Sequence, residues 1–448
     1  MGKKFYIRTY GCQMNERDSE ALARMLTERG MVQTDSEASA DILLFNTCSV
    51  RDQAERKAFG KVGILKKLKR QRPHIIIGVI GCMAQNHGSE IIDNLPHVDL
   101  VVGTDRLHML PEIIDDVQLG KRGQVHVEPG TEVLGQLTGH QQGQVSAYVS
   151  VMRGCNQFCS YCIVPYVRGR EKSRPIKDIV EEIEKLAATG TREVFLLGQN
   201  ITAYGLAEAA AAGRNTKGLS PFADLLRAVN GIGGIERVRF TSPHPRFMNA
   251  PFIDAVTSLP KVCPAFHIPL QSGSDRILQQ MRRGYTRTEY LQKIRQIRDR
   301  QPDAVFSSDV IVGFPGETDD DFAATREVMD QVGFEMAYIF KYSPRTGTKA
   351  AEIPDSVPRQ VKEERNQLLL GDLEKRTLAV NKRYVGQSVE VLVEGPSKRN
   401  AARWMGRARN GKVCIFEPAA AMRPGQLVHM RVQRTTANSL FGDLAELR

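Results

Sequence analysis

Residues 153–162 read Arg-Gly-Cys-Asn-Gln-Phe-Cys-Ser-Tyr-Cys, a short loop that holds three of the chain's eight cysteines. Cys155, Cys159 and Cys162 have a C-x3-C-x2-C spacing that suits three irons of a [4Fe–4S] cluster, whose usual complement is four cysteines. The fourth iron would then lack a protein ligand and could bind a substrate or cofactor, because reactive metal sites keep one position open. A zinc loop or buried cysteines are the alternatives, but zinc needs a fourth ligand and no His or Cys follows closely.

Apolar, strand-like runs recur along the middle of the chain and alternate with helical stretches. Six runs are predicted as strands, at residues 148–152, 193–197, 237–241, 265–270, 306–312 and 336–342. This alternation predicts a central α/β domain over residues 145–376, built as a partial (β/α)6 barrel with the cysteine loop at the end of its first strand. Barrels of this kind carry their active sites at the C-terminal ends of the strands.

Aromatic Tyr161 stands just before the last cysteine, and with this spacing the loop resembles the signature of the radical S-adenosylmethionine (SAM) superfamily. The resemblance implies a radical SAM barrel in which the methionine part of SAM chelates the open iron. SAM also needs acceptors, donors and a flat slot, so the polar strand ends are candidates to bind it, although turn residues can serve backbone geometry alone. The candidates are Tyr161, Gly198, Gln199, Asn200, Ser242, Gln271 and Asp309.

Three further cysteines, Cys12, Cys48 and Cys82, are separated by 36 and 34 residues, and each follows an apolar run that is predicted as a strand. Helical stretches lie between them, at 19–29 and 53–68. The repeated strand–helix unit predicts an N-terminal doubly wound parallel sheet over residues 1–124. Because ligands bind beyond the carboxyl ends of such strands, the three cysteines should converge on a second cluster site. Three unrelated core cysteines are the alternative, as expected for Cys263 and Cys414.

The last segment, residues 381–448, is strongly basic, with twelve Lys or Arg against five Asp or Glu in a chain whose formal net charge is +11. Short strands at 388–393, 404–408, 412–416 and 426–433 predict a small all-β barrel that binds RNA. Arg403, Trp404, Arg407 and Arg409 are expected to contact RNA phosphates and stack on bases. The alternative is a basic face that is only solvated. The segment resembles the TRAM domain, a small RNA-binding barrel.

The remaining sequence features concern linkers and compartment. Residues 125–144, rich in Gly and Gln, are expected to form the first linker, and the Ala-rich residues 207–212 a flexible inserted loop near the active rim. Cysteines without a disulfide framework indicate a reduced, cytoplasmic compartment. No membrane span is expected, since no apolar run approaches the ~20 residues needed.

Domain order and motifs together resemble the radical SAM methylthiotransferases along essentially the whole chain. The resemblance rests on five short sequence motifs, at residues 11–15, 46–51, 197–200, 241–245 and 283–286. In these motifs the chain is most similar to family members that act on N6-isopentenyladenosine beside the tRNA anticodon. Members that modify threonylcarbamoyladenosine or a ribosomal protein are the close alternative, and a non-catalytic iron–sulfur RNA-binding protein is the distant one.

The resemblance implies two [4Fe–4S] clusters and two uses of SAM. The cluster on Cys155, Cys159 and Cys162 would cleave one SAM to methionine and a 5′-deoxyadenosyl radical. A second SAM would methylate sulfur held at the Cys12, Cys48 and Cys82 cluster, and the methylthio group would pass to C2 of the adenine. The implied partners are isopentenylated tRNA, a low-potential electron donor such as a flavodoxin, and a protein that supplies sulfur or Fe–S clusters. We expect a monomer.

Overall fold

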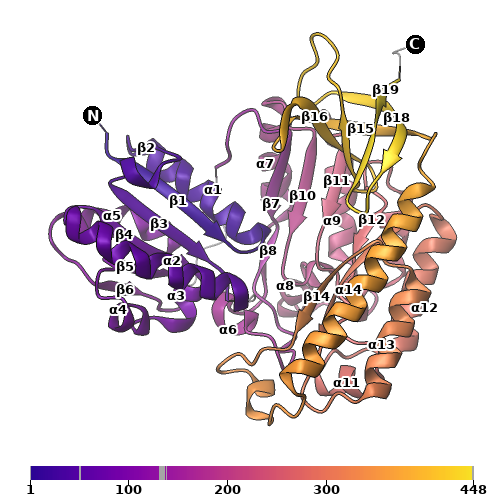
Figure 1. Cartoon of the computed structure of the whole chain (residues 1–448), viewed down its shortest axis with the longest axis horizontal. Coiled ribbons are helices and arrows are strands. Elements are labelled where there is room, and N and C mark those ends of the chain that lie inside the picture. The colour runs from indigo at the N-terminus through magenta and orange to yellow at the C-terminus, as the bar shows by residue number, and fades with distance from the viewer. Residues whose placement is uncertain (1, 50–51, 131–136, 138, 446–448) are drawn as a thin grey trace.

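The computed structural model describes all residues except 1, 50–51, 131–136, 138 and 446–448. Three parts follow one another along the chain and meet side by side (Figure 1). They are an N-terminal α/β sheet, a central partial barrel and a small C-terminal β-barrel. Among the described helices, none combines the length and the apolar character that a membrane span requires.

The N-terminal part is a six-stranded, all-parallel sheet with the order β2-β1-β3-β4-β5-β6. Its strands are β1 (Lys4–Tyr10), β2 (Val32–Gln33), β3 (Ile42–Thr47), β4 (Ile76–Gly81), β5 (Leu100–Gly103) and β6 (Gln124–His126). Both faces of β3 and β4 are buried, which explains their continuous apolar sequences. The expected doubly wound sheet is therefore confirmed, and its order reverses at the β1/β3 switch point, where such sheets bind ligands.

Helices cover both faces of this sheet (Figure 1). Leu22 and Leu26 of α1 (Gln13–Glu28) pack on one face together with α5 (Leu110–Gln118). Val62 and Leu65 of α2 (Asp52–Gln71) pack on the other, with α3 (Cys82–His87) and α4 (Glu90–Asn94). Helix α1 begins at Gln13, six residues before the predicted start, so that Cys12 is its N-cap.

The central part contains the six predicted strands, each parallel to its neighbours. They are β7 (Ser146–Ser150), β10 (Glu193–Leu197), β11 (Arg237–Phe240), β12 (Ala265–His267), β13 (Val305–Val312) and β14 (Met336–Lys341). The strands form two sheets, β11-β10-β7 and β12-β13-β14, linked by an isolated parallel bridge between Val238 and Val262. The outer helices are α7 (Ile176–Ala188), α9 (Pro221–Asn230), α10 (Ala250–Ser258), α12 (Arg287–Arg300) and α13 (Asp319–Val332). This is the open, partial barrel that the alternation predicted.

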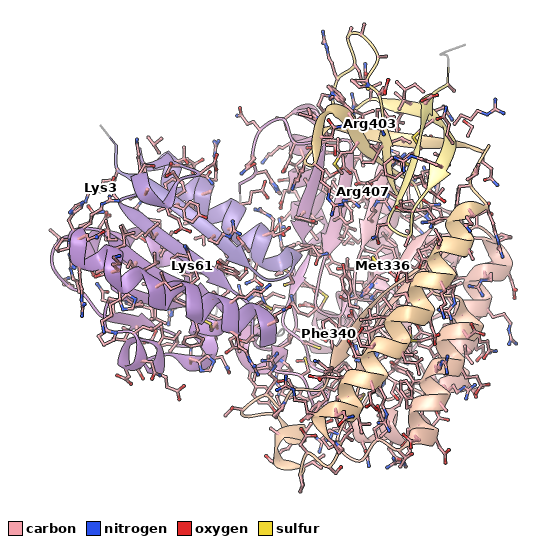
Figure 2. All side chains as sticks on the ribbon, in the orientation of Figure 1. Lys3, Lys61, Met336, Phe340, Arg403 and Arg407 are labelled. Atoms are coloured by element: carbon pink, nitrogen blue, oxygen red, sulfur yellow. The ribbon has the colours of Figure 1, made fainter. Side chains whose placement is uncertain are left out.

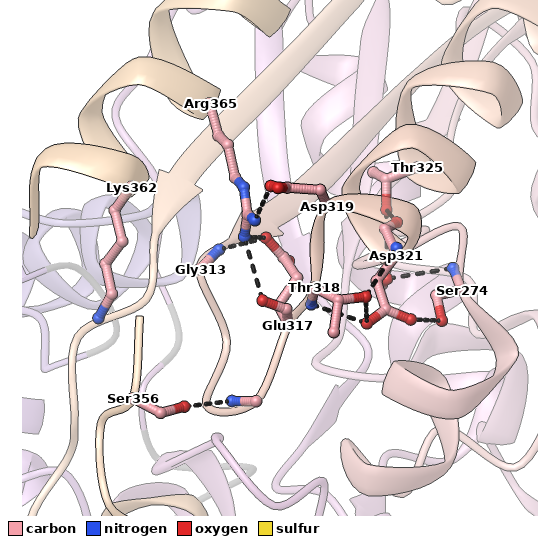
Figure 3. A network of polar contacts seen from close by, with 12 residues as sticks. Ser274, Gly313, Glu317, Thr318, Asp319, Asp321, Thr325, Ser356, Lys362 and Arg365 are labelled. Carbon is pink, nitrogen blue, oxygen red and sulfur yellow. Dashed lines mark hydrogen bonds and ion pairs between the residues drawn. The ribbon is translucent and has the colours of Figure 1, made fainter. Parts of the chain in front are cut away.

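A polar network fixes the turn after β13, at the C-terminal end of that strand (Figure 3). Glu317 accepts a hydrogen bond from the Gly313 amide at 2.9 Å and pairs with Arg365 at 2.6 Å. Thr318 caps α13, and Asp321 accepts a hydrogen bond from Ser274 at 2.5 Å. Helix α14 (Arg359–Lys382), which supplies Arg365, is thereby tied to the strand ends beside it.

The C-terminal part is a closed five-stranded barrel with the order β15-β16-β17-β19-β18. Its strands are β15 (Ser388–Ser397), β16 (Asn400–Ala408), β17 (Val413–Phe416), β18 (Leu427–Thr435) and β19 (Ser439–Leu444), the last of which was not predicted. Two other expectations differ from the structure. The Ala-rich residues form a short helix, α8 (Leu206–Ala211), and α14 runs unbroken through the expected boundary after residue 376.

Candidate active site

A cavity of about 1120 Å³ opens where the three parts meet. Five of the six predicted cluster cysteines line it: Cys12 and Cys48 from the N-terminal sheet, and Cys155, Cys159 and Cys162 from the central loop. Cys82 lies behind this wall, packed against Ile163 and Val167 just beyond the central loop. Two cysteine groups that are far apart in sequence therefore border one space.

Backbone contacts on both sides hold the central cysteine loop. The Cys155 amide donates to the Gly169 carbonyl at 3.1 Å, and the Ser160 amide to the Met281 carbonyl at 3.0 Å. Gly154 has a positive φ of 79°, and a Cβ there would lie 2.1 Å from the Arg170 carbonyl oxygen, so only glycine fits. Burial raises the pKa of Cys155 and of Cys162 to about 12, so these thiols need a positive partner or a metal to ionise.

Arg283 supplies positive charge beside this loop. Its Nη1 lies 3.3 Å from the Cys159 sulfur and 3.5 Å from the Tyr161 hydroxyl oxygen, and the residue is buried. The Tyr285 hydroxyl accepts from Nε at 3.1 Å and fixes the guanidinium plane. Arg283 stands inside the 283–286 motif but was not predicted as a site residue. A basic residue within a motif was the available signal.

The seven residues proposed to bind SAM all line the same cavity: Tyr161, Gly198, Gln199, Asn200, Ser242, Gln271 and Asp309. Four of their side chains already have protein partners, including Tyr161, whose hydroxyl lies beside Arg283. The Gln199 Oε1 accepts from the Gly154 amide at 2.6 Å and thus holds the cysteine loop. The Asn200 Oδ1 accepts from the Thr202 hydroxyl at 3.0 Å. Asp309 lies 3.3 Å from the His267 Nε2, so it faces the cavity as part of a polar pair.

Backbone strain is concentrated around this rim. Five non-glycine residues in the described part of the chain have positive φ, and four of them flank the cavity: Phe158, Ser242, Gln271 and Arg282. Ser242 and Gln271, at φ of 60° and 71°, end strands of the barrel and line the cavity themselves. Such conformations cost on the order of 1–3 kcal/mol each and gather at functional sites. The strain thus independently marks two residues that sequence had singled out.

The three N-terminal cysteines follow β1, β3 and β4, which are neighbours in the sheet. Cys12 is the N-cap of α1 and Cys82 is the first residue of α3, so two thiols sit at positive helix ends. A hydrogen bond from Cys48 and the charge of Arg168 lower the pKa of Cys12 to about 5, whereas burial raises the pKa of Cys82. The site can therefore hold thiolate at neutral pH.

Buried polar atoms around these cysteines fit an anionic group. Arg168 pairs with Asp18 at 2.9 Å, and its Nη1 is buried without a hydrogen-bond partner in the described part of the chain. The Ser49 hydroxyl, beside Cys48, is likewise buried without a hydrogen-bond partner among the described residues. Within the described residues, no group of three or more His, Cys, Asp or Glu side chains is placed to hold a single metal ion.

The four predicted RNA-binding residues lie in different surroundings. Arg403 is 38% exposed and 3.9 Å from Glu417, on the outer side of the C-terminal barrel (Figure 2). Trp404 packs against the barrel core. Arg407 lines the cavity and pairs with Glu394 at 2.8 Å, while the Arg409 Nη2 donates to the Pro260 carbonyl at 2.5 Å. The expected interleaved patch is therefore divided between an outer surface, the cavity and a domain contact.

Comparisons with known proteins agree with this division into three parts. Residues 4–103 match the family described as Uncharacterized protein family UPF0004, residues 149–329 match the Radical SAM superfamily, and residues 382–445 match the TRAM domain. A tRNA-2-methylthio-N(6)-dimethylallyladenosine synthase of Opitutus terrae is 46% identical to this chain and covers 98% of it, over 97% of its own length. The chain belongs to this synthase family.

Other members of the synthase family are similarly close. The protein of that name from Akkermansia muciniphila is 44% identical over 98% of each chain, and the one from Nitrosomonas europaea 42% identical over 100% of each. The threonylcarbamoyladenosine and ribosomal-protein alternatives are not favoured by these names. As a member of this radical SAM family, the protein is an enzyme that uses SAM and [4Fe–4S] clusters.

Two solved structures share the fold at low identity. The radical SAM methyltransferase TsrM of Kitasatospora setae aligns with a TM-score of 0.57 at 14% identity, covering 78% of this chain and 74% of its own. The cobalamin-dependent radical enzyme OxsB aligns with a TM-score of 0.52 at 10% identity, covering 84% of this chain and 56% of its own. These likenesses support the fold alone.

Proposed function

We propose that the protein adds a methylthio group to C2 of N6-dimethylallyladenosine, which is N6-isopentenyladenosine, beside the anticodon of tRNA. One observation carries the proposal: cysteines of both groups line a single cavity that also reaches the basic C-terminal barrel. An enzyme that must activate an adenine carbon and then deliver sulfur to it needs both centres within reach of one bound base.

In this proposal, each cysteine group holds one cluster. The chemistry that the clusters and SAM supply when bound is radical activation of the strong C2–H bond and delivery of a methylated sulfur. Cys155, Cys159 and Cys162 would hold the first cluster, and Cys12, Cys48 and Cys82 the second. Gln199 fixes the first cysteine loop through Gly154, and Asn200 is proposed to meet the amino-acid part of SAM, with Ser242, Gln271 and Asp309 toward its carboxylate or ribose.

Buried arginines serve both groups. Arg283 and Arg168 place guanidinium charge against the cysteines, which stabilises thiolate and an anionic cluster. The cavity also lies between packed domains, so a bound base would be shielded from water while it is modified. These are positioning roles, because neither arginine is proposed to contact the adenine.

The substrate RNA would approach from the C-terminal barrel. Arg407 and Lys412 line the cavity at that side, while Arg403 extends positive charge on the outer surface. A base in an unpaired anticodon loop can be splayed out into such a site. We further propose that Trp404 and Arg409 support the barrel. A low-potential electron donor and a sulfur-supplying protein are proposed to serve the enzyme. It is proposed to work as a cytoplasmic monomer with functional units at 1–124, 145–376 and 381–448.

The test is anaerobic incubation of the cluster-reconstituted protein with SAM, a low-potential reductant and isopentenylated tRNA. Nucleoside mass spectrometry would follow the methylthio product, and the same samples would be assayed for 5′-deoxyadenosine. A methylthio adduct on isopentenyladenosine is the expected result. Deoxyadenosine without the adduct would retain radical SAM chemistry and reject this substrate, and neither product would reject the proposal altogether.

A further inference from the structure

Alternate residues of β14 turn large apolar side chains toward the cavity. Met336 is 47% exposed and Tyr338 is 40% exposed, and with Phe340 they line the cavity on one face of the strand. Ala337 and Ile339, on the opposite face, pack into the barrel core. Met336, Tyr338 and Phe340 are called the β14 strip here. Figure 2 shows Met336 and Phe340 along this strand, with Arg407 above them.

The β14 strip has a fixed geometry. The Tyr338 and Phe340 rings lie nearly parallel, with centroids 6.4 Å apart and 21° between their planes. The His267 ring meets Tyr338 edge-on, with centroids 5.9 Å apart. His267 is itself held by the Ser307 hydroxyl at 3.0 Å and by Asp309 at 3.3 Å. The aromatic surface is therefore built into the cavity wall rather than left as a loose side chain.

The surroundings of the strip narrow its possible ligands. The strip shares the cavity with the three cysteines of the central loop and with Asp309, a proposed SAM contact. Arg407 and Lys412 line the same cavity from the C-terminal barrel, where they pair with Glu394 and Glu335. With these charges paired, the feature of this wall that is open to a ligand is the strip itself, which suits an apolar group that can lie on aromatic rings. Large apolar side chains that remain exposed inside a binding cavity commonly mark such a contact.

We propose that the β14 strip receives the apolar N6 substituent of the target adenosine and thereby selects isopentenylated over unmodified tRNA. This inference rests on the proposed function and deepens it. The substituent is a branched five-carbon chain, and each methylene moved from water into an apolar contact contributes about 0.8 kcal/mol. Partial burial of the chain on Met336 and Tyr338 should favour the isopentenylated RNA at least roughly tenfold.

The experiment compares binding of two anticodon stem–loops, identical except for the isopentenyl group, to the full-length, cluster-reconstituted protein. The wild-type protein should bind the isopentenylated RNA at least roughly tenfold more tightly. Tyr338→Ala and Met336→Ala should bring that ratio toward one while the affinity for the unmodified RNA stays the same. Tyr338→Phe and Met336→Leu, which keep the apolar surface, should retain the ratio.

Leu368→Ala is the matched control, because Leu368 is 42% exposed on α14 and does not line the cavity. It should leave both affinities unchanged. An unaltered ratio in Tyr338→Ala and Met336→Ala would overturn the inference, and so would an equal loss of affinity for both RNAs, which would identify a general base-stacking platform. No preference in the wild type would overturn it as well. The proposed function is judged separately, by whether wild-type protein forms the methylthio product.

Discussion

Arg283 and Arg168 place buried guanidinium groups against the two cysteine sites, and they are the residues most directly able to tune them. The Arg283 Nη1 donates toward the Cys159 sulfur at 3.3 Å. Hydrogen bonds to cluster sulfurs and nearby positive charge favour the reduced, more negative state of an iron–sulfur centre. Arg283 should therefore set how easily the first cluster accepts an electron.

We predict that Arg283→Leu makes the midpoint potential of the first cluster more negative by on the order of 60 mV, equivalent to about 1.4 kcal/mol for one electron. Arg283→Lys keeps the charge but not the planar guanidinium, so its midpoint potential should lie between those of the wild type and of Arg283→Leu. A redox titration followed by electron paramagnetic resonance measures the shift. An unchanged potential in a folded, cluster-loaded Arg283→Leu protein would remove this role.

Single residues also mark the limit of what sequence can predict. The spacing of Cys155, Cys159 and Cys162 is local, so the loop could be interpreted without any knowledge of tertiary contacts. Arg283 lies 124 residues from Cys159, and Arg168 lies 150 residues from Asp18, so their pairings depend on the fold. Sequence placed Arg409 on an RNA surface, whereas its guanidinium is used to join two domains.

At the scale of elements, a buried ionic cluster fastens the end of the first linker to α1 and α7. The His140 Nε2 lies 2.6 Å from Glu182 on α7, and its Nδ1 lies 3.5 Å from Glu20 on α1. Arg17 donates to the Gly139 carbonyl at 2.8 Å. Residues 143–146, which follow directly, line the cavity, so this cluster supports one of its walls.

The cluster should make the linker sensitive to pH. Burial lowers the pKa of His140, but its hydrogen bonds with Glu182 and Glu20 outweigh burial and leave the pKa above the ordinary 6.5. A raised pKa contributes stability that is complete below pH 6.5 and is lost as pH rises through the folded-state value. Glu182, whose pKa is lowered to about 2 by His140 and two arginines against the effect of burial, stays ionised throughout this range.

Amide hydrogen exchange of residues 139–144, corrected for intrinsic rates, should therefore show less protection at pH 8 than at pH 6. His140→Gln should remove that difference, because its amide can hydrogen-bond but does not titrate. Equal protection of the wild-type segment at both pH values would contradict the prediction.

Periodicity predicted most elements, and the exceptions have physical causes. Strands such as β3 and β4 were evident because burial on both faces requires unbroken apolar sequence. Helix α1 starts earlier than predicted because its first turn is polar and faces the Cys12 site, where Asn15 is buried and donates to the Asn46 side chain at 3.0 Å. Strand β19 was missed because its sequence is interrupted by Gly442, which lies against Arg431 of β18.

At the scale of the whole molecule, two arginines on β11 seat the C-terminal barrel on the central one. The Arg239 guanidinium pairs with Glu193 at 2.6 Å and donates to the Ala408 and Arg409 carbonyls, each at 2.9 Å. Arg237 is fully buried and pairs with Glu390 of β15 at 2.8 Å. These contacts hold the basic barrel at the mouth of the shared cavity.

Arg239→Ala should destabilise the protein by about 3–5 kcal/mol, because it leaves Glu193 buried without its partner. Trp404 is the chain's single tryptophan and lies in the barrel, so its fluorescence during urea unfolding reports the loss directly. Arg326→Ala, which breaks an exposed ion pair with Asp372, is the control. It should leave the midpoint of the urea unfolding transition unchanged. Equal transitions in the two variants would show that Arg239 does not secure the barrel.

The two cysteine sites on one cavity are proposed to perform different parts of one reaction. The most direct test measures 5′-deoxyadenosine and methylthiolated nucleoside together, in anaerobic reactions of Cys155→Ala and Cys12→Ala with SAM, reductant and isopentenylated tRNA. We expect neither product from Cys155→Ala, and deoxyadenosine without the methylthio nucleoside from Cys12→Ala. Equal loss of SAM cleavage in both variants would contradict the proposal.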